Sequence, residues 1–223
     1  MHEQNDQAQK HFEEQEWQID NLPNRLTIFR ICLIPFIIAC LYITFFDWPL
    51  FNRYHLFLGY LAAILFVIAS ITDFLDGFFA RRYKLETVFG SFLDPIADKF
   101  LVVSSLIILQ GMDRIPVVIV IILVLREMYM TALRLLAQER GIKIPVNSLG
   151  KWKTAFQMIA IPLLMAYDKP LVFSMPLVGT IFIYIASLFS LYSAFVYSLN
   201  MIRKIKALRA SKKEAKRKSH GAQ

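Results

Sequence analysis

Residues 73–98 read DFLDGFFARRYKLETVFGSFLDPIAD, and this stretch decides the fold and the chemistry of the chain. Its carboxylates form two pairs at helical spacing: Asp73 and Asp76 are three positions apart, and Asp94 and Asp98 are four apart. Residues at these spacings lie on one face of an α-helix. A short connection between the two segments lets the two faces meet, so we expect the four carboxylates to share one pocket.

The chain around this stretch is too apolar for a soluble globular protein. Hydrophobic residues make up 57% of it, and the mean hydropathy is +0.48. Six apolar segments are each close to the length that spans the hydrocarbon core of a bilayer. They cover residues 27–46, 55–75, 92–110, 115–136, 154–168 and 177–202. The sequence therefore predicts an all-α integral membrane protein, a single bundle of six transmembrane helices.

The distribution of charge predicts the topology of this bundle. Lys and Arg are more frequent in the connections after the second and fourth segments than in those at the opposite end, so the positive-inside rule places both termini in the cytoplasm. Three regions result: an acidic N-terminal segment at 1–20, either an interfacial helix or disordered, a membrane domain at 21–202, and a basic cytoplasmic tail at 203–223. No aromatic residues interleave the cations of the tail, which argues against nucleic acid and favours contact with membrane lipids.

Four ionised carboxylates at a membrane boundary need cations. An ionised side chain at mid-membrane costs about 2.5–3.5 kcal/mol, and repulsion between like charges adds to this. Hard oxygen ligands favour Mg²⁺ or Mn²⁺ over zinc, and two such ions can clamp a diphosphate. Gly77 and Gly90 allow the backbone to approach a nucleotide or a facing helix closely, and Arg81 is placed to bind phosphate oxygens.

The same stretch resembles the signature of the CDP-alcohol phosphatidyltransferases, D-x2-D-G-x2-A-R-x8-G-x3-D-x3-D. All eight fixed positions match, namely Asp73, Asp76, Gly77, Ala80, Arg81, Gly90, Asp94 and Asp98. The resemblance implies a homodimer of six-helix subunits in a bacterial-type cytoplasmic membrane, with a two-metal Mg²⁺ or Mn²⁺ site on the cytoplasmic side. It also implies transfer of the phosphatidyl group of CDP-diacylglycerol to an alcohol, with release of CMP.

Roles for individual residues follow from this resemblance. The metal ligands would be Asp73, Asp76, Asp94 and Asp98. Asp98 would also be the general base that accepts the proton of the acceptor alcohol. The residues that bind the CDP group would be Asn21, Thr27, Asp76, Gly77, Ala80, Arg81 and Gly90.

Two further stretches look like one subfamily, the phosphatidylglycerophosphate synthases. They are NLPNRLTIFR at 21–30, and REMYMTALR at 126–134 followed by PVNSLGKWKTAFQ at 145–157. The acceptor of that subfamily is sn-glycerol 3-phosphate, an anion that needs cations beside the metals. The candidates are Arg30, Arg126, Arg134, Lys151 and Lys153. Each could instead be a snorkelling anchor or a partner of Glu127.

Two alternatives remain open at this stage. The first is a sibling phosphatidyltransferase with another acceptor, such as inositol phosphate or phosphatidylglycerol. The second belongs to a different class, a cation transporter whose buried aspartates form a permeation site. Transport does not require Gly77, Ala80 and Arg81 at fixed offsets, and a permeation pathway would not gather every strong charge at one leaflet.

Overall fold

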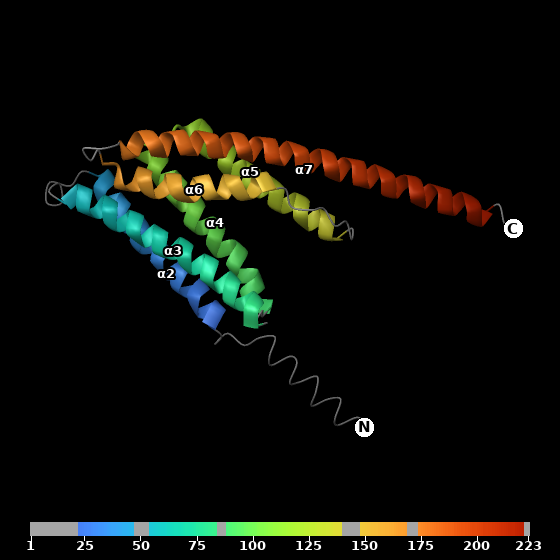
Figure 1. The fold of residues 1–223 in the computed structure, drawn as a ribbon, viewed down its shortest axis with the longest axis horizontal. Coiled ribbons are helices and arrows are strands. Elements are labelled where there is room, and N and C mark those ends of the chain that lie inside the picture. Colours follow the sequence, from blue (N-terminus) through green and yellow to red (C-terminus); the bar gives the residue numbers. More distant parts are fainter. Residues whose placement is uncertain (1–21, 47–53, 84–87, 140–147, 169–173, 221–223) are drawn as a thin grey trace, which may run out of the picture. The chain divides into compact units, whose positions relative to one another are not determined.

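The structure, a computed structural model, describes residues 22–46, 54–83, 88–139, 148–168 and 174–220. Within these ranges the chain folds into six helices, without a strand (Figure 1). They are α2 (Leu22–Phe45), α3 (His55–Tyr83), α4 (Val88–Gly111), α5 (Val117–Glu139), α6 (Ser148–Ala166) and α7 (Met175–His220). The predicted all-α fold is confirmed for the described residues, and each predicted apolar segment lies in a helix of its own.

Two helices extend far past the C-terminal ends of the apolar segments that predicted them. α3 continues past residue 75 to Tyr83, and α7 continues past residue 202 to His220. The extension of α7 is rich in Lys, Arg and Ala, which are strong helix formers without any apolar surface to bury. Hydropathy marks only the apolar part of a helix, so the predicted segment ends before the helix does.

Three of the helices are long and apolar enough to cross a membrane. The spans are Asn24–Phe45, His55–Leu75 and Met175–Ala207. Their exposed faces carry large apolar side chains, among them Phe36 and Leu188, which water solvates poorly and lipid accommodates. The chain is therefore a multi-pass membrane protein, while the number of six spanning helices stays a prediction.

The helices belong to two compact units. The first comprises Met1–Pro116 and Met158–Thr180, and the second comprises Val117–Gln157 and Ile181–Gln223. Helices α2, α3 and α4 lie in the first unit, and α5 lies in the second. α6 and α7 each contribute residues to both.

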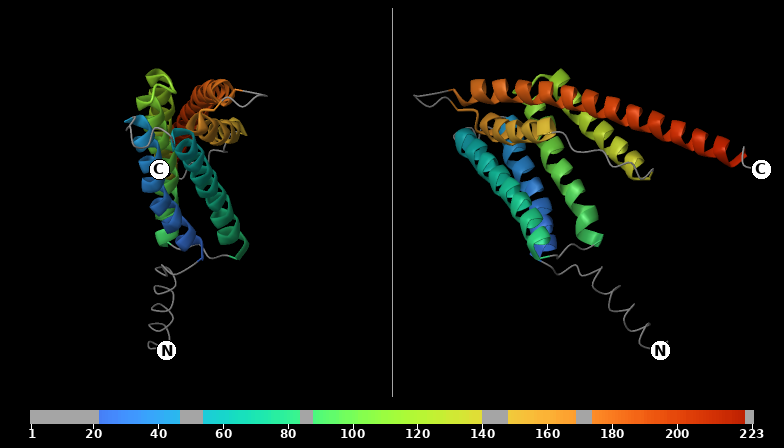
Figure 2. Two further views of the ribbon diagram at one scale, coloured as in Figure 1. Left: turned by 90° about the vertical axis from the view of Figure 1, so that its left-hand side faces the viewer. Right: turned by 45° about the vertical axis from the view of Figure 1, so that its right-hand side comes forward.

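In the first unit, α2 packs against both α3 and α4 (Figure 2). One stripe of α2, with residues three or four positions apart, faces these neighbours. The stripe is apolar in its second half, where Ile34, Ile37 and Leu41 are buried. In its first half it is polar, because Thr27 and Arg30 are fully buried at the same spacing. Buried polar side chains normally form hydrogen bonds, so this stripe indicates polar partners on the neighbouring helices.

Arg114, in the connection after α4, ties that connection to the end of α6. Its guanidinium donates hydrogen bonds to the carbonyl oxygens of Leu164 (2.9 Å) and Met165 (2.7 Å), which lie in the last turn of α6. It also lies 4.4 Å from the centre of the Tyr167 ring. Burial lowers the pKa of Arg114 to about 10, so the group keeps its charge at neutral pH.

In the second unit, α5, the first part of α6 and most of α7 pack together. The ring of Phe156 in α6 meets those of Phe182 (5.5 Å) and Phe189 (5.7 Å) in α7. Further along, Ala137 of α5 and Met201 of α7 are buried in one apolar cluster. This cluster holds α7 against the end of α5, and the basic residues of α7 follow it.

Candidate active site

Three aspartates of the predicted metal site lie against the polar stripe of α2. Asp73 belongs to α3, whereas Asp94 and Asp98 belong to the first half of α4. The hydroxyl of Thr27 donates a hydrogen bond to Asp94, and the guanidinium of Arg30 donates one to Asp98. Arg30 also forms an ion pair with Asp73 at 2.9 Å. Two residues of α2 therefore hold carboxylates that come from two other helices.

The cation of this cluster is buried, and its carboxylates are partly exposed. Arg30 has no exposed side-chain surface, whereas the side chains of Asp73 and Asp98 are 35% and 42% exposed. Both carboxylates bind the same guanidinium nitrogen, Nη1, so their oxygens lie close together. Arg30 approaches them from the protein interior, which leaves their other side accessible to a ligand.

The described side chains do not by themselves form a metal site. Within them, no group of three or more His, Cys, Asp or Glu residues is arranged to hold a metal ion. That search does not include Asp76, whose backbone belongs to α3 but whose side chain lies outside the described residues. The donor chemistry fits Mg²⁺ or Mn²⁺, because these ions take carboxylate oxygens and Asp73 and Asp98 already gather theirs around one positive charge.

The residues predicted to bind the CDP group are described only in part. Thr27 and Gly90 are buried in α2 and α4, and Gly77 is partly buried in α3. Asn21 lies outside the described residues, and so do the side chains of Ala80 and Arg81, as does that of Asp76. These assignments stay predictions.

The sequence analysis missed Asn24, which is 1% exposed and lies one turn before Thr27 on the same stripe of α2. The signal was present in the chain. Asn24, Thr27 and Arg30 recur every three residues in a largely apolar helix, a spacing that predicts a common buried face.

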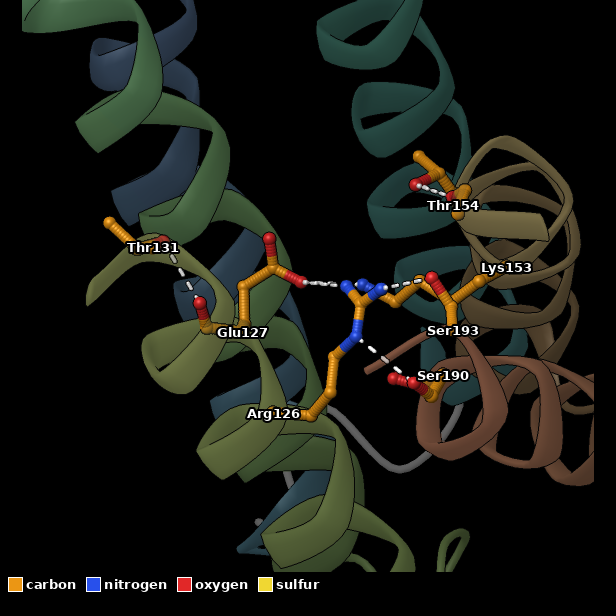
Figure 3. Close-up of polar contacts among 8 residues, drawn as sticks. Arg126, Glu127, Thr131, Lys153, Thr154, Ser190 and Ser193 are labelled. Carbon is orange, nitrogen blue, oxygen red and sulfur yellow. Dashed lines mark hydrogen bonds and ion pairs between the residues drawn. The ribbon is translucent and has the colours of Figure 1, made fainter. Parts of the chain in front are cut away.

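A second polar cluster lies within the second unit (Figure 3). Arg126 of α5 donates hydrogen bonds to the carbonyl oxygen of Ser190 and the hydroxyl of Ser193, both at 3.2 Å, and pairs with Glu127 at 3.4 Å. Lys153 of α6 donates a hydrogen bond to the same Glu127 carboxylate at 2.7 Å. Arg126 and Lys153 are both buried, so neither is an anchor that reaches for the membrane surface.

The four acceptor-binding candidates of this unit therefore differ in their surroundings. Arg126 and Lys153 share Glu127, which was the alternative partner considered for them, while Arg134 and Lys151 are exposed. Sequence reasoning missed the serines. Ser187, Ser190 and Ser193 recur every three residues in α7, and that spacing was the available signal.

Comparison with known proteins identifies the family. A sequence profile of the CDP-alcohol phosphatidyltransferases matches residues 20–192. The chain belongs to this family. As a CDP-alcohol phosphatidyltransferase it is an enzyme, as its sequence predicts, and members of the family generally depend on divalent cations.

Three curated relatives of this CDP-alcohol phosphatidyltransferase share one name, CDP-diacylglycerol--glycerol-3-phosphate 3-phosphatidyltransferase. The protein of Bacillus subtilis is 44% identical over 67% of this chain and 79% of its own length. That of Rickettsia bellii is 40% identical over 80% and 93%, respectively. That of Haemophilus influenzae is 37% identical over 79% and 91%.

Proposed function

We propose that this enzyme transfers the phosphatidyl group of CDP-diacylglycerol to sn-glycerol 3-phosphate and releases phosphatidylglycerol phosphate and CMP. One observation carries the proposal: the relatives that bear the name of this reaction align with the chain over 79–93% of their own length, at 37–44% identity. The alignment thus extends well beyond the aspartate signature.

The reaction is a displacement at phosphorus. A hydroxyl oxygen of glycerol 3-phosphate attacks the β-phosphorus of CDP-diacylglycerol, and the bond from that phosphorus to the bridging oxygen breaks, so that CMP leaves. Asp98 is the general base that accepts the hydroxyl proton. Its partly exposed carboxylate, held on the inner side by Arg30, supports this assignment because a base must reach the substrate.

Two divalent cations, Mg²⁺ or Mn²⁺, would be held by Asp73, Asp76, Asp94 and Asp98. When bound, such ions neutralise diphosphate charge and stabilise the entering and leaving oxygens. The chain's own part is to present these carboxylates on two helices whose charged ends lie against one face of α2.

The CDP group would lie beside the same helix ends. We assign it to Asn21, Thr27, Asp76, Gly77, Ala80, Arg81 and Gly90. The glycines permit close approach of the backbone, and Arg81 binds phosphate oxygens.

The phosphate of the acceptor would be bound by Arg126, Arg134, Lys151 and Lys153. The charge of the second cluster supports this role, because the single carboxylate of Glu127 faces two buried cations and leaves positive charge for an anionic ligand. The corresponding role of Arg30 stays a prediction, since the contacts of its guanidinium are with carboxylates.

We further propose six transmembrane helices in a bacterial-type cytoplasmic membrane, with both termini and the active site on the cytoplasmic side. The basic residues that follow the last apolar segment support this orientation. The regions are the N-terminal segment 1–20, the catalytic membrane domain 21–202 and the tail 203–223, and the enzyme acts as a homodimer.

A panel of acceptors tests the proposal. The purified protein with Mg²⁺ and CDP-diacylglycerol should release CMP with glycerol 3-phosphate and not with inositol phosphate, serine or phosphatidylglycerol. Equal turnover with one of those would make the chain a sibling enzyme. Metal-dependent ion flux in vesicles without CMP release would instead support the transporter.

A further inference from the structure

The polar stripe of α2 contributes no carboxylate, yet three aspartates pair with it through hydrogen bonds or an ion pair. Thr27 binds Asp94, while Arg30 binds both Asp73 and Asp98. Thr27 and Arg30 are one turn apart and have no exposed surface. The accessible surface belongs to the carboxylates that they hold.

A carboxylate without such a partner rotates freely about its last side-chain bond and presents its oxygens in many directions. A hydrogen bond from a buried donor fixes one oxygen and thereby aims the other. Arg30 does this for Asp98 of α4 and holds Asp73 of α3 by an ion pair from the same nitrogen. It also offsets part of the repulsion between them, which would otherwise push the two helix ends apart.

We propose that Thr27 and Arg30 are positioning residues, which fix Asp94, and Asp73 with Asp98, in the orientation that binds divalent cations. This inference rests on the proposed function for the identity of the bound group. The guanidinium suits the task because it is planar, permanently charged and carries several donors, whereas the ammonium of Lys is a single point of charge.

Two variants that conserve charge test the proposal. Thr27→Val keeps the shape of the side chain and removes the hydroxyl, and Arg30→Lys keeps the charge and removes the fork of donors. The measurement is Mn²⁺ affinity of the purified full-length protein without substrate, from free Mn²⁺ counted by electron paramagnetic resonance. Loss of such a partner typically weakens metal binding about 10–100-fold, and we expect losses in this range for both variants. Thr27→Ser, which restores the hydroxyl, should recover most of the affinity.

Matched controls come from the same unit. Thr44 lies on the same stripe of α2, but its hydroxyl donates to the carbonyl of Cys40 in its own helix, so Thr44→Val should bind Mn²⁺ like the wild type. Arg82 is exposed near the end of α3, so Arg82→Lys should also leave the affinity unchanged. Thermal unfolding of each variant without metal shows which of them are folded. If Arg30→Lys does not fold, Thr27→Val decides the question.

The outcomes separate this inference from the proposed function. Wild-type Mn²⁺ affinity in Thr27→Val and Arg30→Lys overturns the positioning role, even if the wild-type protein releases CMP with glycerol 3-phosphate. Weakened Mn²⁺ binding that Thr27→Ser restores supports the positioning role, even if the wild-type protein turns over no acceptor in the panel.

Discussion

The ammonium of Lys153 in α6 lies 2.7 Å from the carboxylate of Glu127 in α5, and the two residues are 26 positions apart in the chain. The same carboxylate pairs with the guanidinium of Arg126 at 3.4 Å. Lys153 and Arg126 are nearly buried, whereas Glu127 is 32% exposed. One partly exposed carboxylate therefore compensates two buried cations.

Removal of this carboxylate charge should destabilise the protein. Glu127→Gln leaves Lys153 and Arg126 buried without an anion, and we expect a loss of about 2 kcal/mol in the free energy of unfolding. Thermal unfolding in detergent measures the change. Glu139→Gln, an exposed change in the same helix, is the control and should have little effect. The double variant Glu127→Gln with Lys153→Met should regain part of the lost stability. Equal stability of Glu127→Gln and the control Glu139→Gln would contradict the shared-carboxylate interpretation.

The exposed cation of α5 gives a test of acceptor binding. Arg134→Gln should raise the KM for glycerol 3-phosphate about tenfold, because a hydrogen bond between charged groups contributes about 1.5–3 kcal/mol. The KM for CDP-diacylglycerol should not change. Initial-rate kinetics with each substrate varied in turn separates the two constants. Lys206→Gln removes an exposed cation from α7 as a control. A similar rise in its KM for glycerol 3-phosphate would show that the effect of Arg134→Gln comes from the change in net charge and not from a specific contact.

The proposed general-base role of Asp98 can be tested by comparison with Asp76, which is proposed as a metal ligand and a CDP-binding residue but not as a base. Asp98→Asn removes the proton acceptor but keeps an oxygen that Arg30 can bind, so the site should stay assembled. Turnover should fall by about 10²–10⁴-fold, the usual contribution of a general base, while affinity for CDP is largely retained. Asp76→Ala should lose both. Calorimetric titration with CDP and an assay of CMP release measure the two properties, and retained turnover in Asp98→Asn would remove the general-base assignment.

The sequence predicted the helices well because membrane-spanning helices are long apolar runs. It failed at helix ends in water, where Tyr83 and His220 extend α3 and α7 past the apolar residues. Helix propensity and not hydropathy decides those ends. Side-chain periodicity likewise placed Asp94 and Asp98 on one helix face.

The sequence indicated Glu127 as a partner of cations, but it could not indicate the partners of Arg30. Arg30 was expected at an acceptor phosphate, yet its guanidinium binds Asp73 and Asp98, 43 and 68 positions further along the chain. Such partners depend on how α2 packs against α3 and α4, and helix periodicity within one segment carries no information about that packing. Asn24 was missed for a different reason, because its spacing from Thr27 was visible and not used.

Gly59 marks a close approach of α3 to the end of α6. A β-carbon at this position would lie 2.8 Å from the carbonyl oxygen of Met165 and 3.2 Å from that of Ala166. Both atoms belong to the backbone, and Arg114 binds the Met165 oxygen as well, so they have little freedom to move away. The glycine is therefore required by packing and not by backbone conformation.

Gly59→Ala should consequently destabilise the protein by about 1–3 kcal/mol, the usual cost of overpacking. Without the contact the sign would be opposite, since alanine stabilises a helix interior by about 1 kcal/mol relative to glycine. Gly111→Ala is the matched control in the same unit, because a β-carbon there meets only the ring of Phe45, at an ordinary 3.9 Å. Thermal unfolding of the two variants should give shifts of different size, with Gly59→Ala clearly lower than the wild type. A stabilised Gly59→Ala would mean that α3 and α6 are further apart in the membrane than these distances state.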